Sequence, residues 1–154
     1  MGGDEWIQAR ITALGLARRL DEARQWLAAM RQAPRVSAFQ AWGDFLMAWL
    51  DHRPTDTLAG VSALSPLKVH DDPDFVFRVG WLLCDVGEHE QGLAYLRQAV
   101  AKAYFVAPTL SASRSFDPLR SDPRFQAILA DAEVGRKRAS AAFREAGGDR
   151  LLGR

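Results

Sequence analysis

The sequence has little of what most catalytic and metal sites require. Its 154 residues include one cysteine, Cys84, and three histidines, His52, His70 and His89. A single cysteine excludes an internal disulfide framework, and three scattered histidines in or near turns argue against a structural zinc site. The patterns GxxxxGK[ST], GxGxxG and GxSxG are all absent, and with them the usual phosphate loops and nucleophile elbows. We therefore expect no enzyme, no cofactor and no bound metal.

The chain also lacks a long apolar run and a strong charge of either sign. Its longest apolar stretch, residues 45–50, is far short of the roughly 20 residues that a membrane helix needs. Twenty basic and nineteen acidic residues give a net charge of +1, which argues against nucleic acid as a partner. The first residues carry neither the basic nor the apolar region of a secretory signal. These features predict a cytoplasmic protein without a membrane partner.

What the sequence does contain is helical periodicity along most of its length. Apolar residues recur three and four positions apart, and no stretch alternates long enough to predict a strand. Pro123 follows Asp122 at the start of the last periodic segment, an order typical of a helix that begins with an Asp cap and a proline in its first turn. We expect an all-α protein built from antiparallel helix pairs.

A repeat of about 34 residues underlies these pairs. The early small or apolar residues in the second helices of three pairs are Ala23, Leu58 and Gly92. They are spaced by 35 and 34 residues, and 34 is the period of the tetratricopeptide repeat. With this alignment, the midpoints of the first helices and the turns between helices also correspond. The midpoints are Ile11, Leu46 and Gly80, and the turns are Arg18, Arg53 and Gly87.

The third unit resembles a tetratricopeptide repeat (TPR) most clearly. It has the small residues of that family at Gly80 and Gly92, the turn glycine at Gly87, a bulky residue at Leu96 and the alanine at Ala99. Small residues let two helices approach closely, and bulky ones fill the space beside them. The first unit departs from the pattern at Ile11 and Arg18. The second unit keeps the early tryptophan, Trp42, but is otherwise degenerate.

The segment 116–129, which includes Asp-Pro-Arg-Phe, resembles the closing segment of many bacterial TPR proteins. This likeness implies a bacterial origin and a helix that covers the last repeat, as a solenoid requires. The expected fold is an α-solenoid of three antiparallel pairs with a C-terminal capping helix. Its parts are TPR-like units at about 4–35, 37–66 and 73–104 within residues 4–104, an irregular connector at 105–121, a capping helix at 122–148 and a tail at 149–154.

In the TPR alignment one face of each first helix lines a concave groove. Trp81 follows the small Gly80 on this face, and Phe77 and Cys84 lie within one turn of it. The predicted partner-binding residues are Gln8, Thr12, Gly43, Met47, Leu50, Phe77, Trp81 and Cys84. Alternatively, the closing helix or a symmetric partner covers Trp81, and Cys84 is a buried small hydrophobe.

The resemblance implies a non-enzymatic scaffold that binds a peptide, a partner protein or another domain of its parent chain. The alternative is a regulatory domain of a larger bacterial signalling protein that binds a small molecule among the tryptophans. Two charged segments add no separate function. The acidic residues of 71–74 suit a helix start better than a cation site, and the basic residues after 135 suit a solvated helix face better than nucleic acid. The sequence leaves the oligomeric state open.

Overall fold

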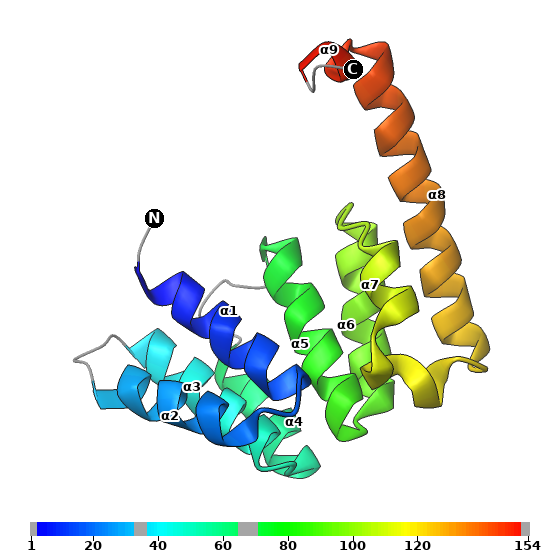
Figure 1. The fold of residues 1–154 in the computed structure, drawn as a ribbon. Helices are drawn as coiled ribbons and strands as arrows, with labels where there is room; N and C mark the ends of the chain where they lie inside the picture. Colours follow the sequence, from blue (N-terminus) through cyan, green and yellow to red (C-terminus); the bar gives the residue numbers. More distant parts are fainter. Residues whose placement is uncertain (1–2, 33–36, 65–70, 152–154) are drawn as a thin grey trace.

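The computed structural model describes residues 3–32, 37–64 and 71–151. Three sequence predictions lie outside these ranges. They are the C-terminal ends of the first two units at residues 35 and 66, the turn position of His70, and residues 152–154 of the tail. The described residues are helical and contain no strand, which confirms the all-α expectation (Figure 1). The helices are α1 (Gly3–Leu16), α2 (Leu20–Gln32), α3 (Ser37–Leu50), α4 (Pro54–Leu64), α5 (Pro73–Val86), α6 (His89–Ala101), α7 (Ala107–Ala112), the 3-10 helix η3 (Arg114–Leu119), α8 (Pro123–Glu145) and α9 (Gly148–Leu151).

Helices that follow one another in the sequence pack against one another. The most extensive contacts join α5 with α6, α3 with α4, and α1 with α2. Contacts between α2 and α3 and between α4 and α5 connect these pairs, while α8 packs on α6 and α7. Local packing of this kind follows from short turns, which keep successive helices adjacent.

The turns after α1, α3 and α5 share one hydrogen-bond pattern. Arg18, His52 and Gly87 have positive φ angles of 61°, 53° and 96°. In each turn this residue donates its N–H to the carbonyl three residues back, and the next residue donates to the carbonyl five residues back. This is the Schellman arrangement, which satisfies the last carbonyls of a helix. The three turns therefore have the same backbone geometry, although only the third contains glycine.

Capping side chains explain where α5 and α8 begin. The Asp72 carboxylate accepts a hydrogen bond from the Asp74 N–H at 2.9 Å, and Asp122 accepts one from the Arg124 N–H at 2.8 Å. Each aspartate is followed by a proline, whose missing N–H costs nothing in the first turn. Helix α8 thus starts where the Asp122–Pro123 pair predicts, and it ends at Glu145, three residues before the predicted limit.

Residues 105–121 differ from the sequence-based expectation of an irregular connector. They contain α7 and η3, and the side chains of Leu110, Phe116 and Leu119 are buried. Six-residue helices are too short to produce a readable period. Pro108 lies in the first turn of α7, where proline is tolerated. The connector is therefore part of the core.

Two hydrophobic clusters make up this core, and α5 belongs to both. Val79, Leu82, Leu83 and Val86 pack with α1–α4, whereas Val76, Phe77 and Cys84 pack with α6–α8. Four residues of α8 are buried (Phe125, Ile128, Ala132 and Gly135), and none after Gly135. The C-terminal part of α8 consequently projects beyond the other helices (Figure 1).

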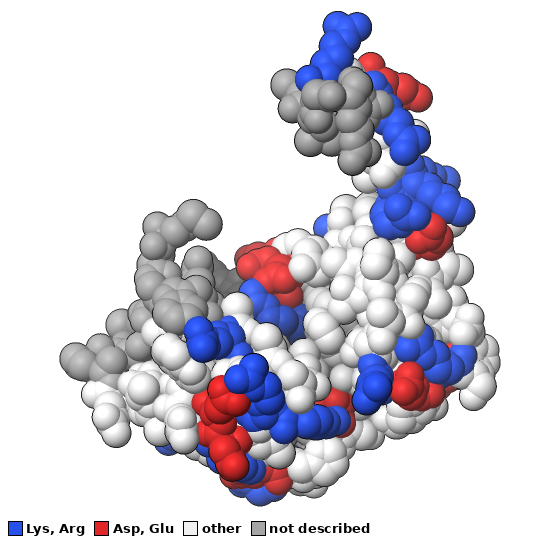
Figure 2. All heavy atoms as spheres, viewed as in Figure 1, with Lys and Arg blue, Asp and Glu red and all other residues white. Residues whose placement is uncertain are grey.

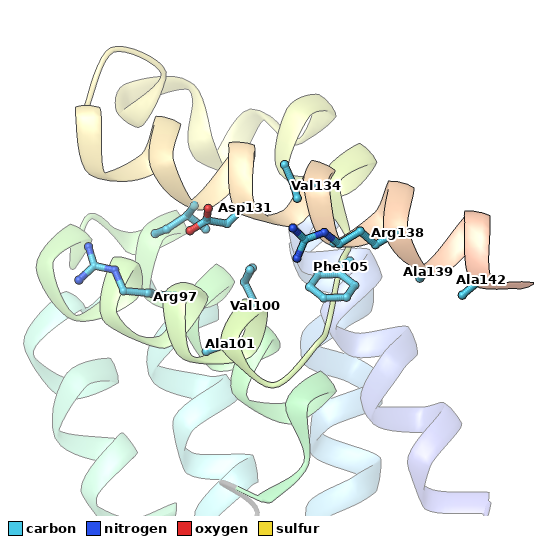
Figure 3. Close-up of a pocket in the computed structure, with 11 residues that line it drawn as sticks. Arg97, Val100, Ala101, Phe105, Asp131, Val134, Arg138, Ala139 and Ala142 are labelled. Atoms are coloured by element: carbon cyan, nitrogen blue, oxygen red, sulfur yellow. The ribbon is translucent and has the colours of Figure 1, made fainter.

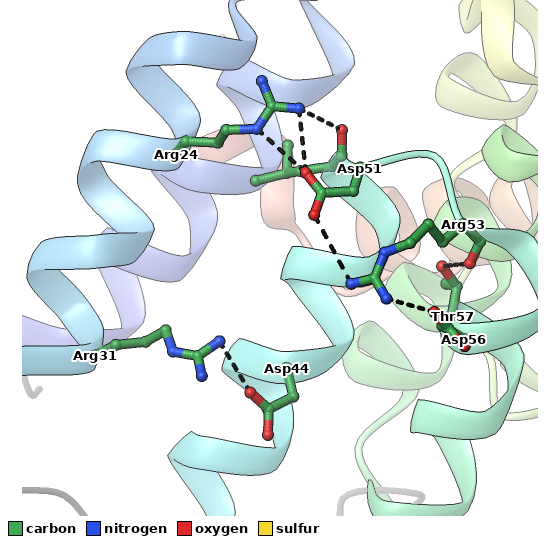
Figure 4. Close-up of polar contacts among 8 residues, drawn as sticks. Arg24, Arg31, Asp44, Asp51, Arg53, Asp56 and Thr57 are labelled. Atoms are coloured by element: carbon green, nitrogen blue, oxygen red, sulfur yellow. Dashed lines mark hydrogen bonds and ion pairs between the residues drawn. The ribbon is translucent and has the colours of Figure 1, made fainter.

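Polar contacts reinforce the junction of α2 with α3. Arg24 reaches the Asp51 carboxylate at 3.2 Å and the Leu50 carbonyl oxygen at 3.3 Å, and Arg31 pairs with Asp44 at 2.9 Å (Figure 4). These side chains are substantially exposed, and each such pair contributes at most about 1 kcal/mol. The apolar clusters, rather than these ion pairs, carry most of the stability.

Candidate binding cleft

A cleft of about 320 Å³ opens between α1, α5 and residues 104–109. We refer to it as the Trp81 cleft. Three of the predicted groove residues, Thr12, Phe77 and Trp81, line it together. The full lining is Ala9, Thr12, Ala13, Leu16, Asp74, Phe77, Arg78, Trp81, Tyr104, Val106 and Thr109. Its walls are mostly apolar, with a few polar groups, as in many binding sites.

The polar groups gather at the N-terminal end of α5. Asp74 accepts a hydrogen bond from the Tyr104 hydroxyl at 2.6 Å and forms an ion pair with Arg78. Figure 2 shows this mixed charge as red atoms beside blue ones at the same end of the helix. Burial alone would raise the pKa of Asp74, but the hydrogen bonds from Arg78 and Tyr104 outweigh it and lower that pKa. Burial and the Asp74 carboxylate raise the pKa of Tyr104 to about 12.

Trp81 is half-buried and held from one side. Its indole N–H donates to the Ser113 hydroxyl at 3.2 Å, and its ring lies 5.6 Å from that of Phe77 and 6.0 Å from that of Phe116. The segment 107–119 therefore covers part of this side chain, while the rest lines the cleft. The alternative cover of Trp81 predicted from the sequence is the closing helix or a symmetric partner, whereas these contacts come from Ser113 and Phe116.

Thr12 supplies a polar group whose hydrogen-bonding capacity is unused. Thr12 is 6% exposed, and its hydroxyl has no hydrogen-bond partner among the described residues. A buried hydroxyl without a partner costs roughly 1–3 kcal/mol. A ligand or water that reached this oxygen would regain part of that energy.

The other predicted groove residues lie elsewhere. Gly43 faces Met30 and Arg31 of α2, Leu50 packs on Gly15 of α1, and the Cys84 sulfur lies against Gly92 of α6. Gln8 and Met47 are half-buried, and neither lines the cleft. The structure thus brings together three of the eight predicted residues, from α1 and α5.

The reason is a difference of one residue in the second unit. The turn residue there is His52 rather than Arg53, so the positions equivalent to Phe77, Trp81 and Cys84 are Trp42, Leu46 and Trp49. All three are at most 3% exposed. These side chains of α3 are buried in the core, and no described residue of α3 lines the cleft.

Sequence reasoning missed the contributions of Ala9, Ala13, Asp74, Tyr104 and Thr109 to the cleft. Tyr104 and Thr109 belong to a segment whose fold back onto α5 no local pattern indicates. The sequence pattern predicts a capping role for Asp74 and its acidic neighbours. The i, i+4 spacing of Asp74 and Arg78 is the one signal that could have suggested their pairing.

A second cavity, of about 310 Å³, lies at the turn end of the helices and is bordered by His52, Cys84, Asp85 and His89. Burial, and secondarily the Asp85 charge, raises the pKa of the Cys84 thiol to about 12. At neutral pH this thiol is protonated and is therefore a poor nucleophile. Among the described residues, moreover, no cluster of three or more His, Cys, Asp or Glu side chains could hold a metal ion.

Asp85 instead joins three parts of the fold. Its carboxylate accepts hydrogen bonds from Trp49 Nε1 at 3.0 Å and from the Ser115 hydroxyl at 2.7 Å, and it pairs with Arg18 at 3.2 Å. The Asp85 side chain is 2% exposed. A buried carboxylate needs several donors, and this one receives them from the first turn, α3 and η3.

Comparisons with known proteins give no assignment. No protein-family model, curated protein or solved structure matches this chain. Within the described residues, no helix is both long and apolar enough to cross a membrane.

Proposed function

We propose that this chain is a TPR-like α-solenoid scaffold that binds an extended peptide or a segment of a partner protein in the Trp81 cleft. The observation that carries the proposal is the convergence of Thr12, Phe77 and Trp81 on one cleft from two different helices. The repeated turns support the solenoid, because Arg18, His52 and Gly87 follow one another at 34 and 35 residues.

The chemistry of the cleft suits a peptide. Phe77 and Trp81 form an aromatic wall of the kind that dominates binding hot spots. The partly exposed Asp74 carboxylate and Arg78 guanidinium offer an acceptor and donors to a peptide backbone or to polar side chains. The volume of about 320 Å³ suits one or two anchoring side chains rather than a large cofactor. The partner could equally be another segment of the parent chain.

Ala13→Tyr is the variant that tests the proposal. Ala13 lines the cleft and is exposed, so a tyrosine there can fill the cleft without disturbing the core. Ala29→Tyr is the matched control, because Ala29 is an exposed helical alanine on α2 away from the cleft. Trp81→Ala is a weaker test, since it also removes the contacts with Ser113 and Phe116.

The experiment selects binders of the full chain from a library of random linear 12-residue peptides and measures their affinities by titration calorimetry. We expect Ala13→Tyr to weaken binding at least tenfold and Ala29→Tyr to leave it unchanged. Equal affinities for the two variants, or no selected peptide at all, would contradict the proposal.

A further inference from the structure

A larger groove, separate from the Trp81 cleft, lies between α6 and α8. Its volume is about 620 Å³, and we call it the α6–α8 groove. Figure 3 shows Val100 and Ala101 on the α6 side, Val134, Arg138, Ala139 and Ala142 along α8, and Phe105 between the two helices. The full lining is Arg97, Val100, Ala101, Phe105, Ile128, Asp131, Val134, Gly135, Arg138, Ala139 and Ala142.

The groove forms because α8 is longer than the helix α6 that packs beside it. Helix α8 has 23 residues and α6 has 13. The Phe105 ring packs directly on Gly135, where an added Cβ would lie 2.5 Å from Phe105 Cζ. This close approach is the last point at which α8 is buried. No residue of α8 beyond it is buried, and Phe143 is 45% exposed. Val134, directly before Gly135, is 49% exposed.

The α8 wall is a continuous stripe of one helix face. Its lining residues are 128, 131, 134, 135, 138, 139 and 142, which follow the three- and four-residue spacing of a single face. At 1.5 Å per residue the stripe extends about 21 Å, the length of roughly four helical turns. A groove with such dimensions suits an amphipathic helix laid along it.

The charges on the groove favour an acidic occupant. Arg97 on α6 and Arg138 on α8 both line it, and neither has an ion-pair partner within the described ranges. Among the described residues that line the groove, Asp131 is the single acidic one. Arg136 and Lys137 lie on the same helix, although both pair with Glu133. Figure 2 shows blue atoms gathered on the projecting part of α8.

We propose that the α6–α8 groove binds an amphipathic helix of a partner protein that carries acidic residues beside its apolar stripe. Val100, Phe105, Val134 and Ala139 would contact the apolar face, and Arg97 and Arg138 would pair with the flanking carboxylates. Nucleic acid fits this surface less well. The floor is aliphatic, and the one aromatic lining residue, Phe105, lies against Gly135 rather than offering a face for base stacking.

The test uses the full chain and a displayed library of 16-residue peptides. Each peptide has leucine at helical spacing, and the flanking positions encode Glu, Lys, Gln and Ala equally. The variants are Ala139→Tyr, which fills the groove, and Ala141→Tyr as its matched control. Both alanines are exposed on α8, but only Ala139 lines the groove. A single-stranded 16-nucleotide DNA probe is measured in parallel.

We expect selection to enrich Glu over Lys at least fivefold at the flanking positions. A selected synthetic peptide should bind Ala139→Tyr at least tenfold more weakly than wild type and should bind Ala141→Tyr like wild type. Arg97→Glu with Arg138→Glu should also weaken it and remove the preference for Glu.

Four results would overturn the proposal. They are a selection without enrichment, a preference for Lys, equal binding by the two tyrosine variants, and DNA binding without peptide binding. Self-association of the chain that Ala139→Tyr abolishes, in the absence of peptide binding, would assign the groove to a second copy instead. None of these results depends on the Trp81 cleft, so the two proposals fail separately.

Discussion

The α3–α4 and α5–α6 pairs make the same turn but pack through different side chains. In α5–α6 two glycines bring the backbones together, because a Cβ added to Gly80 would lie 3.0 Å from the Gly92 carbonyl oxygen. In α3–α4 the residues at the same distances from the turn are Phe45 and Thr57, and both are fully buried. The Phe45 ring there lies against Gly60, one turn further along α4.

This difference shows that the turn does not require one particular packing. The Schellman hydrogen bonds fix how the chain reverses, whereas the side chains decide how closely the helices approach. In α5–α6 the contacts at Gly80 and Gly92 leave no space for an added methyl group. In α3–α4 an added Cβ at Gly60 would lie 3.4 Å from Phe45, which is an ordinary contact. Alanine in place of a glycine at each helix contact, Gly92 in α6 and Gly60 in α4, should therefore have different effects in the two pairs.

The largest effect is expected for Gly92→Ala. The new methyl group would meet the Cys84 sulfur and lie 3.0 Å from the Cys84 backbone nitrogen. We expect the free energy of unfolding to fall by about 2–3 kcal/mol, as for other overpacked cores. Urea unfolding followed by circular dichroism measures this change. Because burial raises the pKa of Cys84 to about 12, its reaction with a thiol reagent at pH 8 should be slow in the wild type and faster in this variant.

Gly60→Ala is the counterpart in α3–α4. Its Cβ would lie 3.4 Å from Phe45 atoms, an ordinary contact, and alanine is favoured over glycine within a helix by about 0.5–1 kcal/mol. We expect this variant to be as stable as the wild type or slightly more so. A loss of stability comparable to that of Gly92→Ala would contradict the difference in packing between the two pairs.

An intermediate effect is expected for Asp85→Asn. An asparagine keeps one acceptor oxygen, so it cannot serve Arg18, Trp49 and Ser115 together. We expect the free energy of unfolding, again measured in urea, to fall by about 1–3 kcal/mol. Asp44→Asn is the control in α3, since its pair with Arg31 is exposed and should contribute less than about 1 kcal/mol. Equal effects at both positions would mean that Asp85 does not hold the helices together.

Effects smaller than those of Gly92→Ala are also expected at the turn residues. His52 has φ 53° and Gly87 has φ 96°, a region that costs non-glycine residues about 1–2 kcal/mol. His52→Gly should raise the free energy of unfolding by about 0.5 kcal/mol, after the larger entropy of the unfolded glycine is counted. Gly87→Ala should lower it by about 1 kcal/mol. Thermal unfolding checks both, and a shift of the same sign in the two variants would argue against equivalent turns.

The sequence predicts the helices well where their signals are local. Asp122 and Pro123 mark the start of α8, Gly87 marks the end of α5, and three- and four-residue spacing marks each apolar face. The second unit was aligned one residue off because neither Phe45 nor Thr57 is a small residue of the expected kind. Because of that shift, the sequence predicts Gly43, Met47 and Leu50 in the partner-binding groove, although none of them lines the Trp81 cleft.

The sequence by itself determined the helical class, the helix ends and the approximately 34-residue spacing of the turns, because each depends on residues close together in the chain. Only the tertiary structure decided which faces remain open. Residues 104–119 fold onto α5 and cover part of Trp81. Phe105 packs on α8 at Gly135, and an open groove runs between α6 and α8 beside this contact. These contacts join residues about 30 positions apart, and no local period or cap specifies them.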